Sequence, residues 1–177
     1  LEEIHQGTSS IGEIIKSLKS YVYLDQSPVQ ALDIHEGLDN TLVILRSKLK
    51  NGVTVERHYA ENIPKIQGYG SELNQVWTNI IDNAADAVGA SGQLVIRTRH
   101  DSEWVVVEIE DNGTGIPEEV QTKVFDPFFT TKPLGQGIGI GLSTCYHILQ
   151  AHGGTITVDS TPGEGAVFMA ILPQYCQ

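Results

Sequence analysis

Glycine stands at every second position of one loop, directly before the apolar, helix-like segment 142–151. Glycine lets the backbone approach a ligand closely, and the free amides at the start of a helix attract an anion. The segment therefore has to fold as a glycine-lined turn that leads into a helix start, and this arrangement predicts a phosphate site. The glycines of this series are Gly135, Gly137, Gly139 and Gly141.

A second feature is an apolar, strand-like run that ends on an acid. Residues 104–110 read WVVVEIE, and Asp111 follows them, with Gly113 and Gly115 next in the chain. We expect Asp111 at a strand end, where the two glycines bend the chain and the carboxylate can accept a hydrogen bond from an amine. Taken alone, an Asp before Asn-Gly equally favours an ordinary turn.

The third feature is a pair of asparagines on a predicted helix over residues 71–88. Asn79 and Asn83 are four residues apart, so they lie on one face of that helix. A buried, unsatisfied amide costs about 1 to 3 kcal/mol, so a polar ligand or neighbour should meet them. Asp86 follows three residues later. Two roles are open for it: contact with the ligand, or a bridge to a neighbouring loop.

Hydrophobic periodicity predicts an α+β fold, a two-layer α/β sandwich with one mixed sheet covered on one face by helices. An N-terminal helix over residues 1–24 precedes it, with a heptad-like seam that needs a partner helix. Ser71 is the expected cap of the helix over residues 71–88. The other expected helices are residues 35–50 and 142–151, and the expected strands are 53–59, 93–99, 104–110, 155–159 and 166–172.

Charge and composition narrow the class of protein. The formal net charge of −11 argues against a nucleic-acid surface, which needs clustered Lys and Arg. The sequence has no apolar run of about 18 residues and no basic-then-apolar leader, so we expect no membrane contact by this segment. Cys145 and Cys176 form no disulfide framework, which favours a cytoplasmic setting, while the full-length protein can still be anchored upstream.

Four motifs in order carry a resemblance to a known family. They are NIIDNAADA from Asn79, DNGTGIP from Asp111, VFDPFFTTKP from Val124 and GQGIGIGL from Gly135. These segments resemble the N, G1, F and G2 boxes of the catalytic and ATP-binding domain of sensor histidine kinases, in the GHKL superfamily with gyrase, the ninety-kilodalton chaperone and MutL. The resemblance spans residues 33–173 and implies the Bergerat-type ATP-binding fold.

The resemblance also implies roles for single residues. Asn83 gives its side-chain oxygen to Mg²⁺, and Asp111 accepts the exocyclic amine of adenine, which excludes guanine. Lys132 either reaches the terminal phosphates or is merely solvated. The implied catalytic residues are Asn79, Asn83 and Lys132. The implied ATP-binding residues are Asn79, Asn83, Asp86, Asp111, Gly113, Gly115, Ile116, Phe125, Thr130, Thr131, Lys132, Gly135, Gly137, Ile138, Gly139, Ile140, Gly141 and Leu142, with Ile138 standing where the family commonly has Thr.

The implied function is transfer of the ATP γ-phosphoryl group to a histidine. Hydrolysing relatives have a glutamate base at the position of Asn79, and an amide there favours a kinase over a hydrolase. None of the six histidines is followed by an acid and then a proline, so we expect the acceptor upstream of Leu1. Residues 1–27 would be the second helix of the dimerisation and phosphoacceptor hairpin, and residues 28–177 the catalytic domain.

The expected ligands and partners are ATP or ADP with Mg²⁺, a second copy of the chain paired through the N-terminal helix, and the receiver domain of a response regulator. Residues 128–137 are expected to form a lid that is ordered by nucleotide. Two alternatives stay open: an ATP-binding regulatory module without phosphoryl transfer, and an ATP-gated clamp of the same superfamily.

Overall fold

The structure, a computed structural model, describes residues 29–50, 52–132 and 137–175 of the 177. The expected helix over residues 1–24, the proposed domain boundary after residue 27, and Gly135 lie outside the described residues.

The centre of the fold is a five-stranded mixed sheet in the order β2-β4-β5-β7-β6. Strands β2 and β4 are parallel, and every other neighbouring pair is antiparallel. All five expected strands are present, each within about two residues of its expected bounds. Their bounds are β2 Val53–His58, β4 Gly92–His100, β5 Trp104–Asp111, β6 Thr155–Thr161 and β7 Gly165–Pro173.

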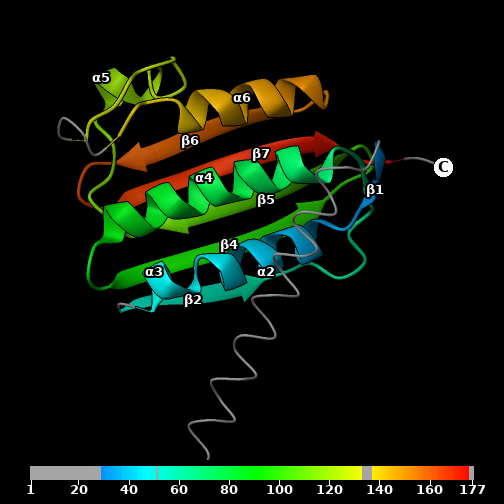
Figure 1. The fold of residues 1–177 in the computed structure, drawn as a ribbon, viewed down its shortest axis with the longest axis horizontal. Helices are drawn as coiled ribbons and strands as arrows, with labels where there is room; N and C mark the ends of the chain where they lie inside the picture. Colours follow the sequence, from blue (N-terminus) through cyan, green and yellow to red (C-terminus); the bar gives the residue numbers. More distant parts are fainter. Residues whose placement is uncertain (1–28, 51, 133–136, 176–177) are drawn as a thin grey trace, which may run out of the picture.

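Three helices lie side by side across one face of this sheet: α2 (Ile34–Ile44), α4 (Gly70–Val88) and α6 (Gly141–Ala151) (Figure 1). The middle helix, α4, packs on both of its neighbours and on strands β4, β5 and β7. Its Trp77, Ile80 and Ile81 are buried in the core between the two layers. The expected two-layer α+β sandwich, with helices on one face, is thus confirmed.

Two expected helix boundaries were wrong. The single helix expected over residues 35–50 is α2 followed by α3 (Arg46–Leu49), because the chain leaves the helical path at Leu45 before it buries Leu49. Helix α4 begins at Gly70, not behind a Ser71 cap. The residue before it, Tyr69, is held by a distant partner, since its amide donates to His152 Nε2 over 3.1 Å.

Three short elements were not expected from the sequence. Strands β1 (Gln30–Leu32) and β3 (Ile66–Gly68) pair antiparallel as a separate two-stranded sheet, and α5 (Glu118–Gln121) is one helical turn after β5. Segments of three or four residues are too short to show a hydrophobic period, which explains why they were missed. Across the described ranges, no helix is long and apolar enough to span a membrane.

Candidate functional site

The N box lies on α4 and is joined to the start of α6. Asn79 Nδ2 donates a hydrogen bond to the Gly141 carbonyl oxygen over 3.1 Å. The two helices therefore meet where the glycine series ends and α6 begins. The polar partner that the sequence predicted for Asn79 is the backbone of the glycine series itself.

Lys132 links the F box to the N box. Its Nζ donates to Asn83 Oδ1 over 3.2 Å and to Asp86 Oδ2 over 2.6 Å. Of the two roles open for Lys132, solvation alone is therefore wrong for this structure. Through Lys132, Asp86 is bridged to a neighbouring loop, which was one of the two roles that the sequence left open for it.

Asp86 has a second lysine partner that the sequence did not predict. Lys48 of α3 places its Nζ 2.5 Å from Asp86 Oδ1 and 2.6 Å from Asp82 Oδ1. Partial burial alone would raise the pKa of Asp86, but the hydrogen bonds and charges of Lys132 and Lys48 outweigh it and lower that pKa. The carboxylate is thus held in its charged form. No local motif marks Lys48, because its partners lie 34 or more residues away in the chain.

Asp111 ends β5 and is buried, with 3% of its surface exposed. The Gly113 amide donates to its Oδ1 over 2.9 Å, so the carboxylate does form the local turn that Asp-Asn-Gly suggests. Burial raises the pKa of Asp111, and the backbone amides of Gly113 and Ala166 only partly offset this. A buried carboxylate whose pKa is shifted by burial is a candidate functional group.

The F box and the G2 box contact each other through backbone. The Phe128 amide donates to the Gly139 carbonyl over 2.8 Å, and both residues have positive φ, +67° and +71°. A Cβ at Gly139 would lie 2.5 Å from backbone atoms of Phe128 and Phe129, so this close approach requires glycine. The side chains of Thr130 and Lys132 lie close to Gly137, where a Cβ would come within 3.0 to 3.2 Å of their atoms. These glycines bring two motifs together.

The remaining predicted residues divide into two groups. Ile116, Phe125 and Leu142 are partly buried against the core, and Gly115 lies against the Thr161 backbone. Thr131, Ile138 and Ile140 are exposed, Ile138 at 75%. The structure thus gathers most of the predicted set around the C-terminal half of α4 and the start of α6. Residues 133–136 lie outside the described residues, and the expected lid stays a prediction.

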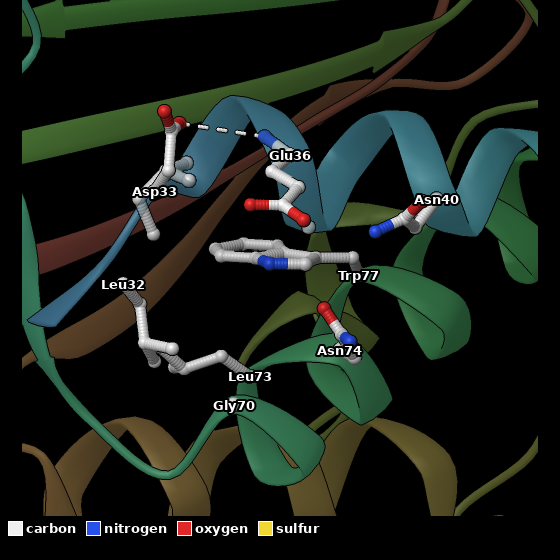
Figure 2. A pocket seen from close by; sticks show the side chains of 10 residues that line it. Leu32, Asp33, Glu36, Asn40, Gly70, Leu73, Asn74 and Trp77 are labelled. Carbon is white, nitrogen blue, oxygen red and sulfur yellow. Dashed lines mark hydrogen bonds between the residues drawn. The ribbon is translucent and has the colours of Figure 1, made fainter. Parts of the chain in front are cut away.

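A small cavity between α2 and α4 lies apart from these motifs. Figure 2 shows the Trp77 ring within it, flanked by Glu36 and Asn74. The space open to water is about 60 Å³, too small for a nucleotide. Asn74 Nδ2 is buried there without a hydrogen-bond partner among the described residues. A few water molecules fit the size and the polarity of this cavity.

Comparison with known proteins decides the family. Residues 68–175 match the family described as histidine kinase-, DNA gyrase B- and HSP90-like ATPase. The chain belongs to this family. The predicted resemblance to the catalytic and ATP-binding domain of sensor histidine kinases is thereby confirmed.

Relatives of this histidine-kinase ATPase domain are sensor kinases. The chain is 30% identical over 186 residues to sensor kinase CckA of Brucella abortus (strain 2308), covering 97% of this chain and 20% of that protein. It is 36% identical over 166 residues to the signal transduction histidine-protein kinase AtoS of Escherichia coli (strain K12), covering 93% of this chain and 27% of AtoS. The chain therefore spans about a fifth to a quarter of these two relatives.

A solved structure has the same fold. The nucleotide-free catalytic domain of histidine kinase ThkA superposes with a TM-score of 0.76 at 29% identity. The match covers 84% of this chain and 97% of the ThkA domain. The sandwich described above is therefore the fold of a histidine-kinase catalytic domain.

The side-chain oxygens of the N box are suitable ligands for a magnesium ion. Mg²⁺ prefers one or two protein oxygens and completes its shell with waters and phosphate oxygens. Asn83 Oδ1 and the Asp86 carboxylate are such oxygens, and a cation, the Lys132 ammonium, already contacts both. Within the described residues no cluster of three or more His, Cys, Asp or Glu offers a fuller metal cage.

A glycine variant tests how closely the G1 box must approach α4 in this histidine-kinase domain. A Cβ at Gly113 would lie 2.6 Å from the backbone carbonyl atoms of Ala87. Gly113→Ala is therefore expected to destabilise the fold by about 1 to 3 kcal/mol and to lower ATP affinity, because the loop must shift away from the helix. Chemical denaturation and nucleotide titration measure the two effects.

The matched control is Gly89→Ala. Its Cβ would meet nothing within 4 Å, so it carries only the cost of a positive φ, +65°. Denaturation that finds Gly113→Ala at least as stable as the wild type would show that the close approach is not required.

Proposed function

We propose that this domain binds ATP with Mg²⁺ and forms the catalytic part of a sensor histidine kinase. The observation that carries the proposal is the joining of the boxes: Lys132 contacts Asn83 and Asp86, and Asn79 holds the Gly141 carbonyl. These contacts join three motifs that are separate in sequence, the N, F and G2 boxes, and Gly113 of the G1 box lies against Ala87 at the end of the N box. Family membership supports ATP as the nucleotide.

The base would be recognised by Asp111. A buried carboxylate that accepts the exocyclic amine of adenine forms a charge-assisted hydrogen bond, and guanine offers an acceptor at that position instead. Because Asp111 is buried at the end of β5, a base that leaves this carboxylate without a donor would bind much more weakly. The domain should therefore prefer ATP to GTP.

The phosphates would be held at the other end of the site. Asn83 would offer Oδ1 to Mg²⁺, and Asp86 would hold one of the metal's waters. Lys132 would turn from these two side chains to the terminal phosphates. The amides of the glycine series at the start of α6 would bind the remaining phosphate oxygens. Bound Mg²⁺ would neutralise negative charge on the phosphates.

The transfer step would depend on positioning rather than on a base. Asn79 has no useful basicity, and its amide is already used to hold the Gly141 carbonyl. Efficient activation of water is therefore disfavoured, while an acceptor imidazole is nucleophilic by itself. Phosphoryl transfer needs little more than alignment and charge neutralisation, which the residues above would provide.

The proposal extends to the whole protein, namely to the histidine that accepts the phosphoryl group and to the partner proteins. The acceptor histidine would lie outside residues 1–177, and residues 1–27 would pair with a second copy as part of a helical bundle. A response regulator receiver domain would take the phosphoryl group next. Support for this partner is limited to fold: histidine kinase ThkA in complex with response regulator TrrA has the same fold at 24% identity and a TM-score of 0.72. A cytoplasmic location belongs to the same proposal.

Labelled ATP tests the kinase. The full-length gene product is expected to gain an acid-labile, base-stable label, as phosphohistidine does, while residues 1–177 alone remain unlabelled. The full-length Asn83→Ala variant is the control and should lose the label. Strong ATP binding without any transfer would contradict the kinase and favour the regulatory module.

A further inference from the structure

Lys48 makes a set of contacts that none of the family motifs contains. It lies on α3, and its Nζ contacts both Asp82 and Asp86 of α4. It also donates to the Asp82 carbonyl over 3.2 Å. The side chains are partly exposed, Lys48 at 35%, Asp82 at 41% and Asp86 at 37%. Partial burial lowers the pKa of Lys48, but its two aspartate partners outweigh this and raise that pKa, so the ammonium stays charged.

Asp86 therefore carries one lysine on each oxygen. Lys48 binds Oδ1, and Lys132 binds Oδ2 while also reaching Asn83. The contacts run in a row from α3 through α4 to the loop after α5. Two aspartates and two lysines balance to zero charge at the place where a polyanion would bind.

Binding of Mg²⁺ and phosphates must change this row. Asn83 Oδ1 is occupied by the Lys132 ammonium, and a second cation at the same oxygen would be repelled by the first. Lys132 has to leave as the metal arrives. Asp86 would then keep only one of its two lysines, Lys48, and without Lys48 its unpaired carboxylate beside the phosphates would oppose binding.

We propose that Lys48 is a positioning residue of the nucleotide site: it holds Asp86 and offsets the charge of Asp82, so that Lys132 is free to move to the phosphates. The inference rests on the proposed function. Lys48 keeps its place on Asp86 Oδ1 when Oδ2 is vacated. Without it, Lys132 would be the one lysine on Asp86, and Asp86 would compete with the nucleotide for that lysine, while Asp82 would lose the lysine that it contacts.

A purely structural role for Lys48, as a link between α3 and α4, predicts something different. Partly exposed ion pairs contribute little to stability, and their loss would affect every ligand alike. The positioning role affects only ligands that carry phosphates. Comparison of ATP with adenosine separates the two roles, because adenosine places nothing near Lys132.

The experiment is calorimetric titration of Mg·ATP, Mg·ADP and adenosine into residues 1–177. Lys48→Met is expected to weaken Mg·ATP and Mg·ADP by about 3- to 5-fold, the size of one partly exposed charge contact, and to leave adenosine unchanged. Lys48→Arg should restore binding. Adding Lys48→Met to an Asp86→Asn variant should cost less than adding it to the wild type, because one of the two aspartate partners of Lys48 is already neutral.

Lys50→Met is the matched control, since it removes the same charge from the exposed cap residue of the same helix. An equal loss in Lys50→Met, an equal loss for adenosine, or unchanged Mg·ATP binding in Lys48→Met would each overturn the inference. If Lys48→Met unfolds, Lys48→Gln is the second charge-removing variant, and it should show the same loss of Mg·ATP binding with adenosine binding unchanged. A wild type that binds no Mg·ATP would instead contradict the proposed function itself.

Discussion

Replacing Asn83 by alanine is expected to weaken binding of Mg·ATP by about 10- to 100-fold, because a contact to a charged group is worth about 1.5 to 3 kcal/mol. The variant removes the oxygen that Lys132 contacts and that we assign to the metal. The side chain is only half-buried, so folding should change little. Calorimetry with and without Mg²⁺ measures the effect.

Adenosine supplies the control for Asn83→Ala. It carries no phosphate and binds no metal, so the variant and the wild type should take it up equally. A variant that binds Mg·ATP as tightly as the wild type, or that loses adenosine to the same extent, would remove Asn83 from the metal site.

The second large effect is expected at Asp111. Asp111→Asn should lower ATP affinity by about 10- to 100-fold and reduce the preference for ATP over GTP, because it removes a charge-assisted acceptor worth about 1.5 to 3 kcal/mol. Asp159→Asn, on the exposed side of β6, removes the same charge elsewhere and should leave both affinities unchanged. Titration of both nucleotides into the three proteins measures this. Retained ATP preference in Asp111→Asn would show that another group reads the base.

The same carboxylate predicts a pH dependence. Burial raises the pKa of Asp111 above its ordinary value of 3.8. As the pH is lowered, this carboxylate is therefore protonated at a higher pH than an exposed aspartate. Adenosine affinity should fall as the pH drops through this raised pKa, at a pH above 3.8. The sign for folding is opposite, since protonation of this buried group favours the folded state and that gain is lost as pH rises through the raised pKa. Asp111→Asn should abolish both effects.

The motifs and the layers could be predicted well from the sequence because both have local signals. The strand before Asp111 and the helix that carries Asn79 have clear hydrophobic periods, and the glycine series precedes a helix start. The resemblance of the four boxes then placed them in one fold.

Contacts between distant residues could not be predicted from the sequence. Lys48 meets Asp82 34 residues later in the chain. The amide of Tyr69, the residue before α4, donates to His152, which is 83 residues away in the chain. Propensity rules consider only neighbouring residues, and they therefore favoured a cap at Ser71. A lysine in a helix and a histidine at a helix end carry no sequence signal of such partners, because the fold alone brings them together.

Titration of Mg·ATP and Mg·GTP into residues 1–177 shows whether the joined boxes form an ATP site. Binding should also raise the melting temperature, because only the folded chain binds. We expect binding of Mg·ATP with at least about tenfold preference over Mg·GTP, the smallest ratio expected from one charge-assisted hydrogen bond. Absence of binding, or equal affinity for the two nucleotides, would contradict an ATP site at the joined boxes.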